Sequence, residues 1–140
     1  MTESLADLYQ AAVQRYNDGE TAANLIPVFR EICDRSGRKN AAAWSSLAWL
    51  YLLDDKPEKA VRAAQKGVKA DSHAPQARIN LALAMLDSGE KGVRKHIEVA
   101  QETMSLSSEL RDDVLENIKD GLERKPDWAN LKRVQKWLFD

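Results

Sequence analysis

The chain has 140 residues, a length that fits one folded domain. Hydrophobic residues make up 44% of it and charged residues 31%, a mixture typical of a globular protein and not of a disordered one. The 21 Lys and Arg residues against 22 Asp and Glu leave a net charge of −1, without the basic surplus of a dedicated nucleic-acid-binding protein.

Two further features restrict the class of protein. Cys33 is the only cysteine, so the chain can form neither an internal disulfide nor a cysteine-based metal cage. The most apolar window, residues 41–53, is too short to cross a bilayer. We therefore expect a soluble, cytoplasmic protein without membrane insertion.

Glycine and proline residues divide the chain into eight amphipathic segments. Four glycines follow apolar stretches, where the left-handed conformation of a helix C-cap favours glycine. Three prolines fall where new stretches begin, because a first helical turn tolerates proline. These residues are Gly19, Gly37, Gly89 and Gly121, and Pro57, Pro75 and Pro126. The pattern predicts helices at 4–17, 22–36, 41–54, 57–70, 75–87, 91–105, 108–122 and 126–139, and no strands.

The predicted helices repeat in pairs with a period near 34 residues. The set Trp44, Leu47, Ala48 and Tyr51 aligns with Tyr9, Ala12, Val13 and Tyr16 at an offset of 35 residues. A third unit follows at an offset of 34, and a weaker fourth unit completes the chain. Because one helical hairpin cannot bury its apolar face alone, such a period predicts hairpins that stack into a continuous core.

The residues Trp44, Leu47, Ala48, Tyr51 and Ala60 resemble the signature of the tetratricopeptide repeat (TPR) family. The resemblance implies an all-α, right-handed superhelical stack of antiparallel helix pairs. It suggests one TPR-like domain over 1–140, with repeats at about 6–40, 41–74 and 75–106 and a capping helix pair at 107–140. Its motif residues are packing residues, so the resemblance is informative about fold and uninformative about the partner.

Few residues have the chemistry of a catalytic, cofactor-binding or metal site. His73 and His96 are the only histidines, and neither has a second histidine at helical spacing. Cys33 shares a helix face with Phe29 and Ile32, which predicts a buried, unreactive thiol. The glycines occur singly, so no phosphate-binding loop is present. We expect no catalytic, cofactor or metal site and no enzyme activity.

The TPR resemblance also implies a concave groove formed by the first helices of successive repeats. The predicted groove residues are Gln10, Gln14, Ser45, Trp49, Leu52, Gln76, Ile79, Asn80 and Leu83. Trp49 has two interpretations. It either anchors a partner in the groove or packs between repeats, because the helix that carries it is apolar nearly all round.

The resemblance leads to one negative prediction about this groove. TPR domains that bind the acidic tails of heat-shock chaperones hold two carboxylates with Lys, Asn and Arg side chains. The five corresponding positions here are uncharged: Gln10, Gln14, Ser46, Gln76 and Asn80. Because carboxylates gain most from charged, bidentate partners, we expect this groove to bind apolar side chains and main-chain polar groups instead.

Two surfaces outside the predicted groove have alternative interpretations. An acidic stretch is either a solvated outer face or a docking strip for a basic partner segment. It comprises Glu109, Asp112, Asp113 and Glu116. The last helix, with Trp128 and Trp137, is either a lid on the stack or a surface for self-association.

The sequence therefore predicts a non-enzymatic protein-interaction module, a scaffold or assembly factor that binds a segment of another protein. One alternative is a permanent accessory subunit of a larger complex, photosynthetic or other, which would bury the same groove. A small regulatory enzyme is a more distant alternative. No cofactor and no nucleic-acid partner is expected.

Overall fold

The computed structural model describes residues 4–140, and residues 1–3 lie outside the described part of the chain. Helices make up 81% of it, and no strand occurs among the described residues. The helices are α1 (Leu5–Asn17), α2 (Ala22–Ser36), α3 (Ala41–Leu53), α4 (Pro57–Ala70), α5 (Pro75–Asp87), α6 (Arg94–Ser105), α7 (Ser108–Arg124) and α8 (Ala129–Phe139), with a short 3-10 helix, η1 (Gly37–Lys39), between α2 and α3. The predicted all-α fold class is confirmed.

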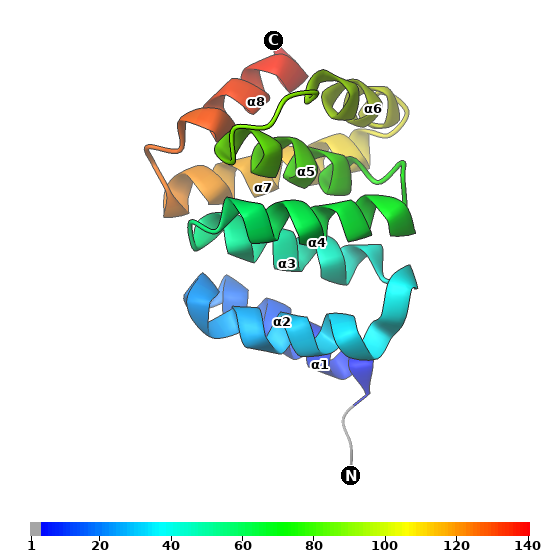
Figure 1. Cartoon of the computed structure of the whole chain (residues 1–140), viewed down its shortest axis with the longest axis vertical. Coiled ribbons are helices and arrows are strands. Elements are labelled where there is room, and N and C mark those ends of the chain that lie inside the picture. The colour runs from blue at the N-terminus through cyan, green and yellow to red at the C-terminus, as the bar shows by residue number, and fades with distance from the viewer. Residues whose placement is uncertain (1–3) are drawn as a thin grey trace.

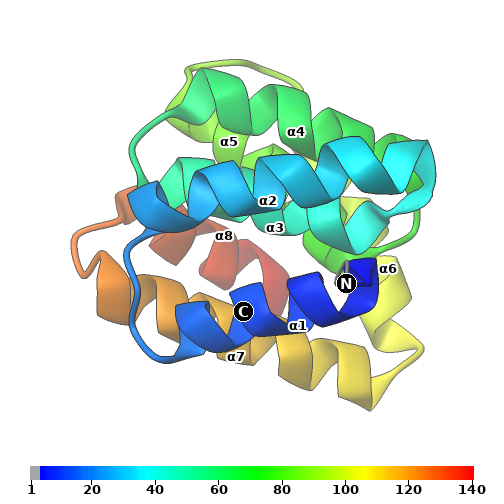
Figure 2. The ribbon, with the colours of Figure 1, turned by 90° about the horizontal axis from the view of Figure 1, so that it is seen from below.

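The helices stack in pairs along the long axis of the molecule (Figure 1). The pair α1–α2 forms one end, α3–α4 and α5–α6 follow, and α8 lies at the other end. Seen from below, α2 and α4 lie on one side, α1 and α7 on the other, and α3 between them (Figure 2). The first and the seventh helix are thus neighbours, although about a hundred residues separate them in the sequence.

Local sequence signals set half of the helix ends. The side chains of Ser4, Asn40 and Ser107 accept hydrogen bonds from the backbone N–H three residues later, as N-cap residues do. Pro57 and Pro75 occupy first turns. Three of the four predicted cap glycines have positive φ angles, between 73° and 97°, at helix C-termini. These are Gly19, Gly37 and Gly89.

The fourth predicted cap, Gly121, does not end a helix. It lies inside α7, which continues to Arg124. A Cβ atom at this position would lie 2.7 Å from Leu131 Cδ2 and 2.9 Å from the Trp49 ring, distances that real Cβ contacts do not reach. Glycine is required here because two other helices pack directly against the backbone of α7.

Two helices begin later than the sequence predicts. α6 begins at Arg94 and not at 91, because Gly92 has a φ of 90° that interrupts the helical backbone. α8 begins at Ala129 and not at 126, since Pro126 belongs to a turn that is closed by a hydrogen bond from Trp128 N to Lys125 O.

One hydrophobic core runs through the stack. α3 and α5 contribute most to it, because each is enclosed by neighbours on two sides and is apolar nearly all round. Cys33 belongs to this core, where burial raises the pKa of its thiol to about 12 and keeps it protonated. No helix in residues 4–140 is both long and apolar enough to cross a membrane.

The packing of Ala60 generates a first prediction. Ala60 is fully buried on α4. We expect Ala60→Arg to destabilise the protein by ~3–5 kcal/mol, because it places an unpaired charge in the core. The free energy of unfolding in urea is the measurement. Gln65→Arg, an exposed position on the same helix, is the matched control and should leave stability nearly unchanged. Equal stability of the two variants would contradict the packing described here.

Candidate functional site

A cleft of about 650 Å³ lies between α1 and the three helices α3, α5 and α7. Its size falls within the range of ligand and peptide sites. We call it the concave cleft. It is lined by Tyr9, Val13, Tyr16, Asn17, Phe29, Ala41, Ala42, Ser45, Ser46, Trp49, Leu50, Asp71, Ala74, Pro75, Gln76, Ala77, Asn80, Leu110, Asp113, Val114, Glu116 and Asn117.

One wall of the concave cleft is α1. Tyr9 packs edge-to-face on Phe29, with 5.8 Å between ring centroids, and its hydroxyl lies 3.2 Å from Ser46 Oγ across the cleft. Only Ala12 of this helix is fully buried, so α1 is held mainly by partly buried side chains such as Val13. The wall is therefore the least tightly packed side of the site.

A chain of amide hydrogen bonds crosses the floor of the concave cleft from α7 to α3. Asn117 Nδ2 donates to Gln76 Oε1 (2.9 Å), and Gln76 Nε2 donates to Asn80 Oδ1 (2.7 Å). Asn80 Nδ2 in turn donates to the backbone carbonyl of Ser45 (2.8 Å). Each amide group has two N–H bonds and uses one of them here. The Asn117 and Gln76 side chains, which are not buried, thus keep an N–H for a bound chain.

All the charged side chains that line the concave cleft are negative. Three carboxylates face the concave cleft, those of Asp71, Asp113 and Glu116, and the lining contains no Lys or Arg. Apolar side chains supply most of the remaining surface. The site is therefore suited to a segment that combines apolar and basic side chains.

At one end, a polar cluster joins α1 to α3 and α7. The Tyr16 hydroxyl accepts a hydrogen bond from Trp49 Nε1 (2.9 Å) and donates one to the Asp120 carboxylate. Arg124 stacks on the Tyr16 ring at 3.8 Å from its centroid and also pairs with Asp120 (3.1 Å). We call these four residues the Tyr16 junction.

The Tyr16 hydroxyl stays protonated in this environment. Burial, followed by the hydrogen bond to Asp120, raises the pKa of the phenol well above its usual range. At neutral pH the hydroxyl is therefore available as a donor to Asp120, and the Tyr16 junction holds α1 against α7. It closes this end of the concave cleft.

Four of the nine predicted groove residues line the concave cleft: Ser45, Trp49, Gln76 and Asn80. Three others, Leu52, Ile79 and Leu83, are fully buried in the core. They have no surface for a partner, because the faces of α3 and α5 that carry them pack against other helices. Gln10 and Gln14 are exposed on α1 and do not line the concave cleft.

On α1, the residues that face the concave cleft lie one position before the predicted ones. Tyr9 and Val13 line the cleft as Ser45 and Trp49 of α3 do, an offset of 36 residues (45 minus 9) and not the predicted 35. With this shift Tyr9, Val13 and Tyr16 face the concave cleft. Their spacing of four and three residues is the sequence signal that identifies them as one helix face.

Trp49 belongs to both of its predicted environments. Its side chain lines the concave cleft, but only 9% of the residue is exposed. The ring packs on Trp128 of the α7–α8 turn, with 5.4 Å between centroids, and against Gly121. It therefore forms a fixed part of the cleft wall more than a free anchor.

The predicted acidic strip divides between two surfaces. Asp113 and Glu116 line the concave cleft, whereas Glu109 and Asp112 are exposed outside its lining.

The two tryptophans of the C-terminal region also differ. Trp128 is buried and donates its Nε1–H to Asp87 (3.1 Å), while Trp137 is partly exposed.

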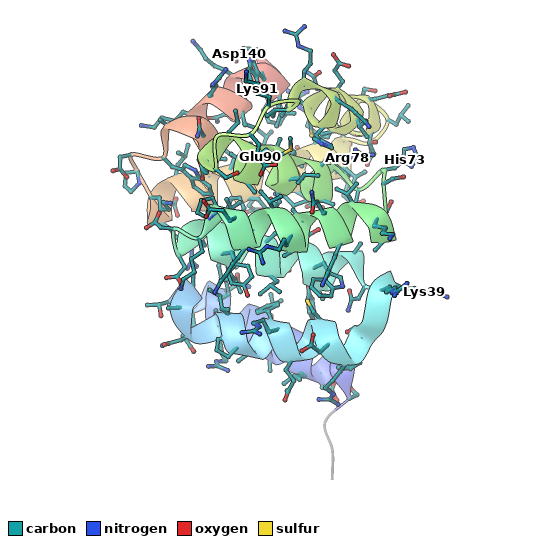
Figure 3. The ribbon with its side chains drawn as sticks, viewed as in Figure 1. Lys39, His73, Arg78, Glu90, Lys91 and Asp140 are labelled. Carbon is teal, nitrogen blue, oxygen red and sulfur yellow. The ribbon has the colours of Figure 1, made fainter. Side chains whose placement is uncertain are left out.

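The two histidines have different environments. His73 is exposed in the turn between α4 and α5 (Figure 3), but His96 is half-buried and its Nδ1 lies 2.9 Å from Arg78 Nη1. Because Arg78 can only donate, the imidazole accepts through its unprotonated nitrogen. Burial, then the charges of Arg78 and Lys95, lowers the pKa of His96. Among residues 4–140, no three His, Cys, Asp or Glu side chains gather as metal ligands would.

The Tyr16 junction generates a second prediction. We expect Tyr16→Phe to destabilise the protein by ~1–3 kcal/mol, because Trp49 Nε1 and Asp120 both lose a partner in a partly buried site. Amide hydrogen exchange in α1 should also become faster. Tyr9→Phe is the matched control, since it removes one neutral hydrogen bond and should cost only ~0.5–1.5 kcal/mol. Equal exchange rates in the two variants would contradict the role of the junction.

Comparison with known proteins gives structural neighbours only. No protein-family model matches the sequence, and no curated protein matches it either. The fold is similar to that of SycD, the type III secretion translocator chaperone of Yersinia enterocolitica, in the crystal structure of an alternative dimer. That match has a TM-score of 0.67 and 19% sequence identity, and it covers 99% of this chain and 91% of the SycD chain. A crystal structure of SycD in complex with a peptide of the translocator YopD matches with a TM-score of 0.58 and 19% identity, over 99% of this chain and 92% of the other. This chain therefore shares the all-α, TPR-like fold of SycD.

Proposed function

We propose that this protein is a non-enzymatic binding protein, a scaffold or chaperone whose concave cleft holds a segment of a partner protein. The observation that carries the proposal is the cleft itself: four helices enclose about 650 Å³ lined by apolar, amide and acidic groups. The likeness to SycD, which has been crystallised with a peptide of YopD, supports a peptide ligand for a stack of this shape. The predicted location remains the cytoplasm.

The lining defines the chemistry of the segment. Val13 and Trp49 offer apolar surface, and Asp113 and Glu116 on α7 offer negative charge beside it. A partner segment with an aliphatic or aromatic side chain next to a Lys or Arg complements both. Exposed ion pairs contribute little affinity, so the carboxylates would act mainly on selectivity and on the association rate.

The amide groups on the floor suit the main chain of such a segment. Gln76 and Asn117 are already oriented by their hydrogen bonds to each other and to Asn80. Preorganised donors lose little conformational entropy when a ligand arrives. They can therefore bind backbone carbonyls without selecting for sequence.

An acidic C-terminal tail fits this site poorly. Gln76 and Asn80, at the positions of the clamp's Lys and Arg, and Ser46, at the position of an Asn, line the concave cleft together with three carboxylates. An acidic ligand would meet repulsion there and no compensating cation. We therefore place this protein apart from co-chaperones that bind chaperone tails through the groove.

The permanent accessory subunit is a weaker second candidate. Such a subunit would expose a large apolar surface when isolated. Among the described residues, the exposed large hydrophobic side chains are Leu106 (84%) and Trp137 (39%). These two residues make a small surface, which favours a protein that is stable alone and binds its partner reversibly.

Selection from a library of random peptides displayed on phage tests the proposal. We expect the immobilised protein to enrich peptides with an apolar side chain beside Lys or Arg, and Ala42→Trp to abolish the enrichment by filling the concave cleft. Ala42 is an exposed residue of the lining. Ala23→Trp, at an exposed position of α2 outside the lining, is the matched control. Enrichment that survives Ala42→Trp, or that favours acidic peptides, would contradict the proposal.

Charge neutralisation tests the selectivity separately. Asp113→Asn/Glu116→Gln should weaken binding of a selected basic peptide about fivefold, the size expected for two exposed ion pairs. Glu109→Gln/Asp112→Asn removes the same charge from the same helix outside the lining and should leave the affinity unchanged. Fluorescence anisotropy of the labelled peptide measures both. An equal loss of affinity in the two double variants would show that the charge of α7 acts only at long range and not through contacts in the cleft.

A further inference from the structure

A second hollow lies on the other side of α3 from the concave cleft. It encloses about 330 Å³ between α2, α3 and α4, and we call it the convex crevice. Trp44, Leu47 and Tyr51 reach it from α3, whereas Ser45 and Trp49 reach the concave cleft. At about 100° per residue, the two sets occupy opposite faces of one helix. In Figure 2, α2 and α4 lie on the side of α3 away from α1 and α7.

Four cations surround this crevice. Lys59, Arg62 and Lys66 follow one face of α4 at spacings of three and four residues, and Arg30 faces them from α2. Asp34 is the only carboxylate in the lining. None of the four cations forms an ion pair among residues 4–140. The local charge is therefore strongly positive in a chain whose net charge is −1.

Tyr51 contributes an accessible hydroxyl at the same place. Tyr51 is only 8% exposed, and its side chain lines the convex crevice. Its hydroxyl makes no hydrogen bond to any described residue, although every fully buried side-chain N or O atom in the described structure has a partner. The hydroxyl therefore opens towards the crevice, where it can donate to a bound anion.

Trp44 adds a rigid apolar edge. Lys66 Nζ lies 4.5 Å from the centroid of its ring, a cation–π contact that keeps the ammonium group beside the crevice. The floor consists of the buried side chains of Cys33, Leu47 and Ala63. Charge, a free hydroxyl and a defined floor thus occur in one small volume.

We propose that the convex crevice is a second binding site, which holds an Asp- or Glu-rich segment of a partner protein. Carboxylates of the segment pair with Arg30, Arg62 and the two lysines, and one of them accepts a hydrogen bond from Tyr51. A protein segment fits better than a nucleic acid, because Lys66 covers one face of the Trp44 ring and so reduces the aromatic surface for base stacking. The proposal does not depend on the function assigned to the concave cleft.

The consequence is a protein with two binding surfaces of opposite charge, back to back on α3. A basic, apolar segment would enter the concave cleft, while an acidic segment would bind the convex crevice. The two segments can belong to one partner or to two.

Fluorescence anisotropy with a labelled peptide of Asp, Glu, Gly and Ser tests the proposal, with a Gly/Ser peptide of equal length as the blank. We expect saturable binding that weakens as salt is added. Arg30→Glu/Arg62→Glu should weaken it about tenfold or more, since two attractive pairs become repulsive. Lys132→Glu/Lys136→Glu makes the same charge change at exposed positions on α8 and should leave the affinity within about twofold.

Tyr51→Phe provides a readout that bulk charge does not affect. Because the hydroxyl has no partner within the protein, the melting temperature should stay the same or rise, while the affinity for the acidic peptide falls about threefold or more. Equal weakening by both charge-reversal pairs, or full affinity in Arg30→Glu/Arg62→Glu, overturns the proposal.

Two further measurements test whether the convex crevice binds something other than an acidic protein segment. Tighter binding of poly(U) RNA than of the acidic peptide, lost in Arg30→Glu/Arg62→Glu, would assign the crevice to nucleic acid and overturn the proposal. Self-association in analytical ultracentrifugation, lost in that same variant, would instead make a second copy of this chain the occupant. Ala42→Trp, which fills the concave cleft, should leave the acidic peptide bound, so failure of one proposal is distinguishable from failure of the other.

Discussion

The close approach of Trp49 to the backbone of α7 is the constraint on which the rest of the structure depends. The indole ring fits only because position 121 is glycine, and it is fixed from another side by Trp128. Its Nε1 then orients the Tyr16 hydroxyl, which reaches Asp120 on α7. One side chain therefore connects the first, second and fourth helix pairs. These contacts hold α1 beside α7, as Figure 2 shows the two helices, and the concave cleft lies between α1 and the helices of this wall.

The middle of the stack shows how one helix can supply two chemically different surfaces. α3 has almost no amphipathic character, which in isolation indicates a helix buried all round. Its flanks nevertheless reach the surface on two sides, through Ser45 and Ser46 towards the acidic cleft and through Trp44 and Tyr51 towards the basic crevice. The near-zero net charge of the chain therefore does not mean a uniformly neutral surface, since an acidic and a basic hollow lie on opposite sides of α3.

The sequence was sufficient for the all-helical stack because period, caps and prolines act locally, and most helix bounds agree within a residue. The sequence did not predict features that depend on how helices far apart in the chain pack together. Gly121 has the sequence context of a C-cap, yet its role is set by Trp49, a residue 72 positions earlier (121 minus 49). The residues of α1 that face the cleft lie one position before the predicted ones. The first repeat has too few signature residues to fix its offset from the second repeat. The repeat pattern predicts Ile79 and Leu83 in the groove, but the helices packed against α5 bury both residues completely. The two acidic residues that reach the cleft could not be separated from the two that do not, because all four lie on one predicted helix.

The weak packing of α1 has a consequence for the kinetics of binding. Since Ala12 is its only fully buried residue and its strongest polar contacts lie near its C-terminal end, this helix can separate from the stack at a smaller free-energy cost than global unfolding. Opening of that wall would admit a chain from the side, without threading an end through a closed passage. Association would then be limited by how often the wall opens, and the residence time by how firmly the occupied cleft keeps it closed. A partner held in this way would leave only when the wall opens, so its residence time would depend on the packing of α1 as well as on its own contacts.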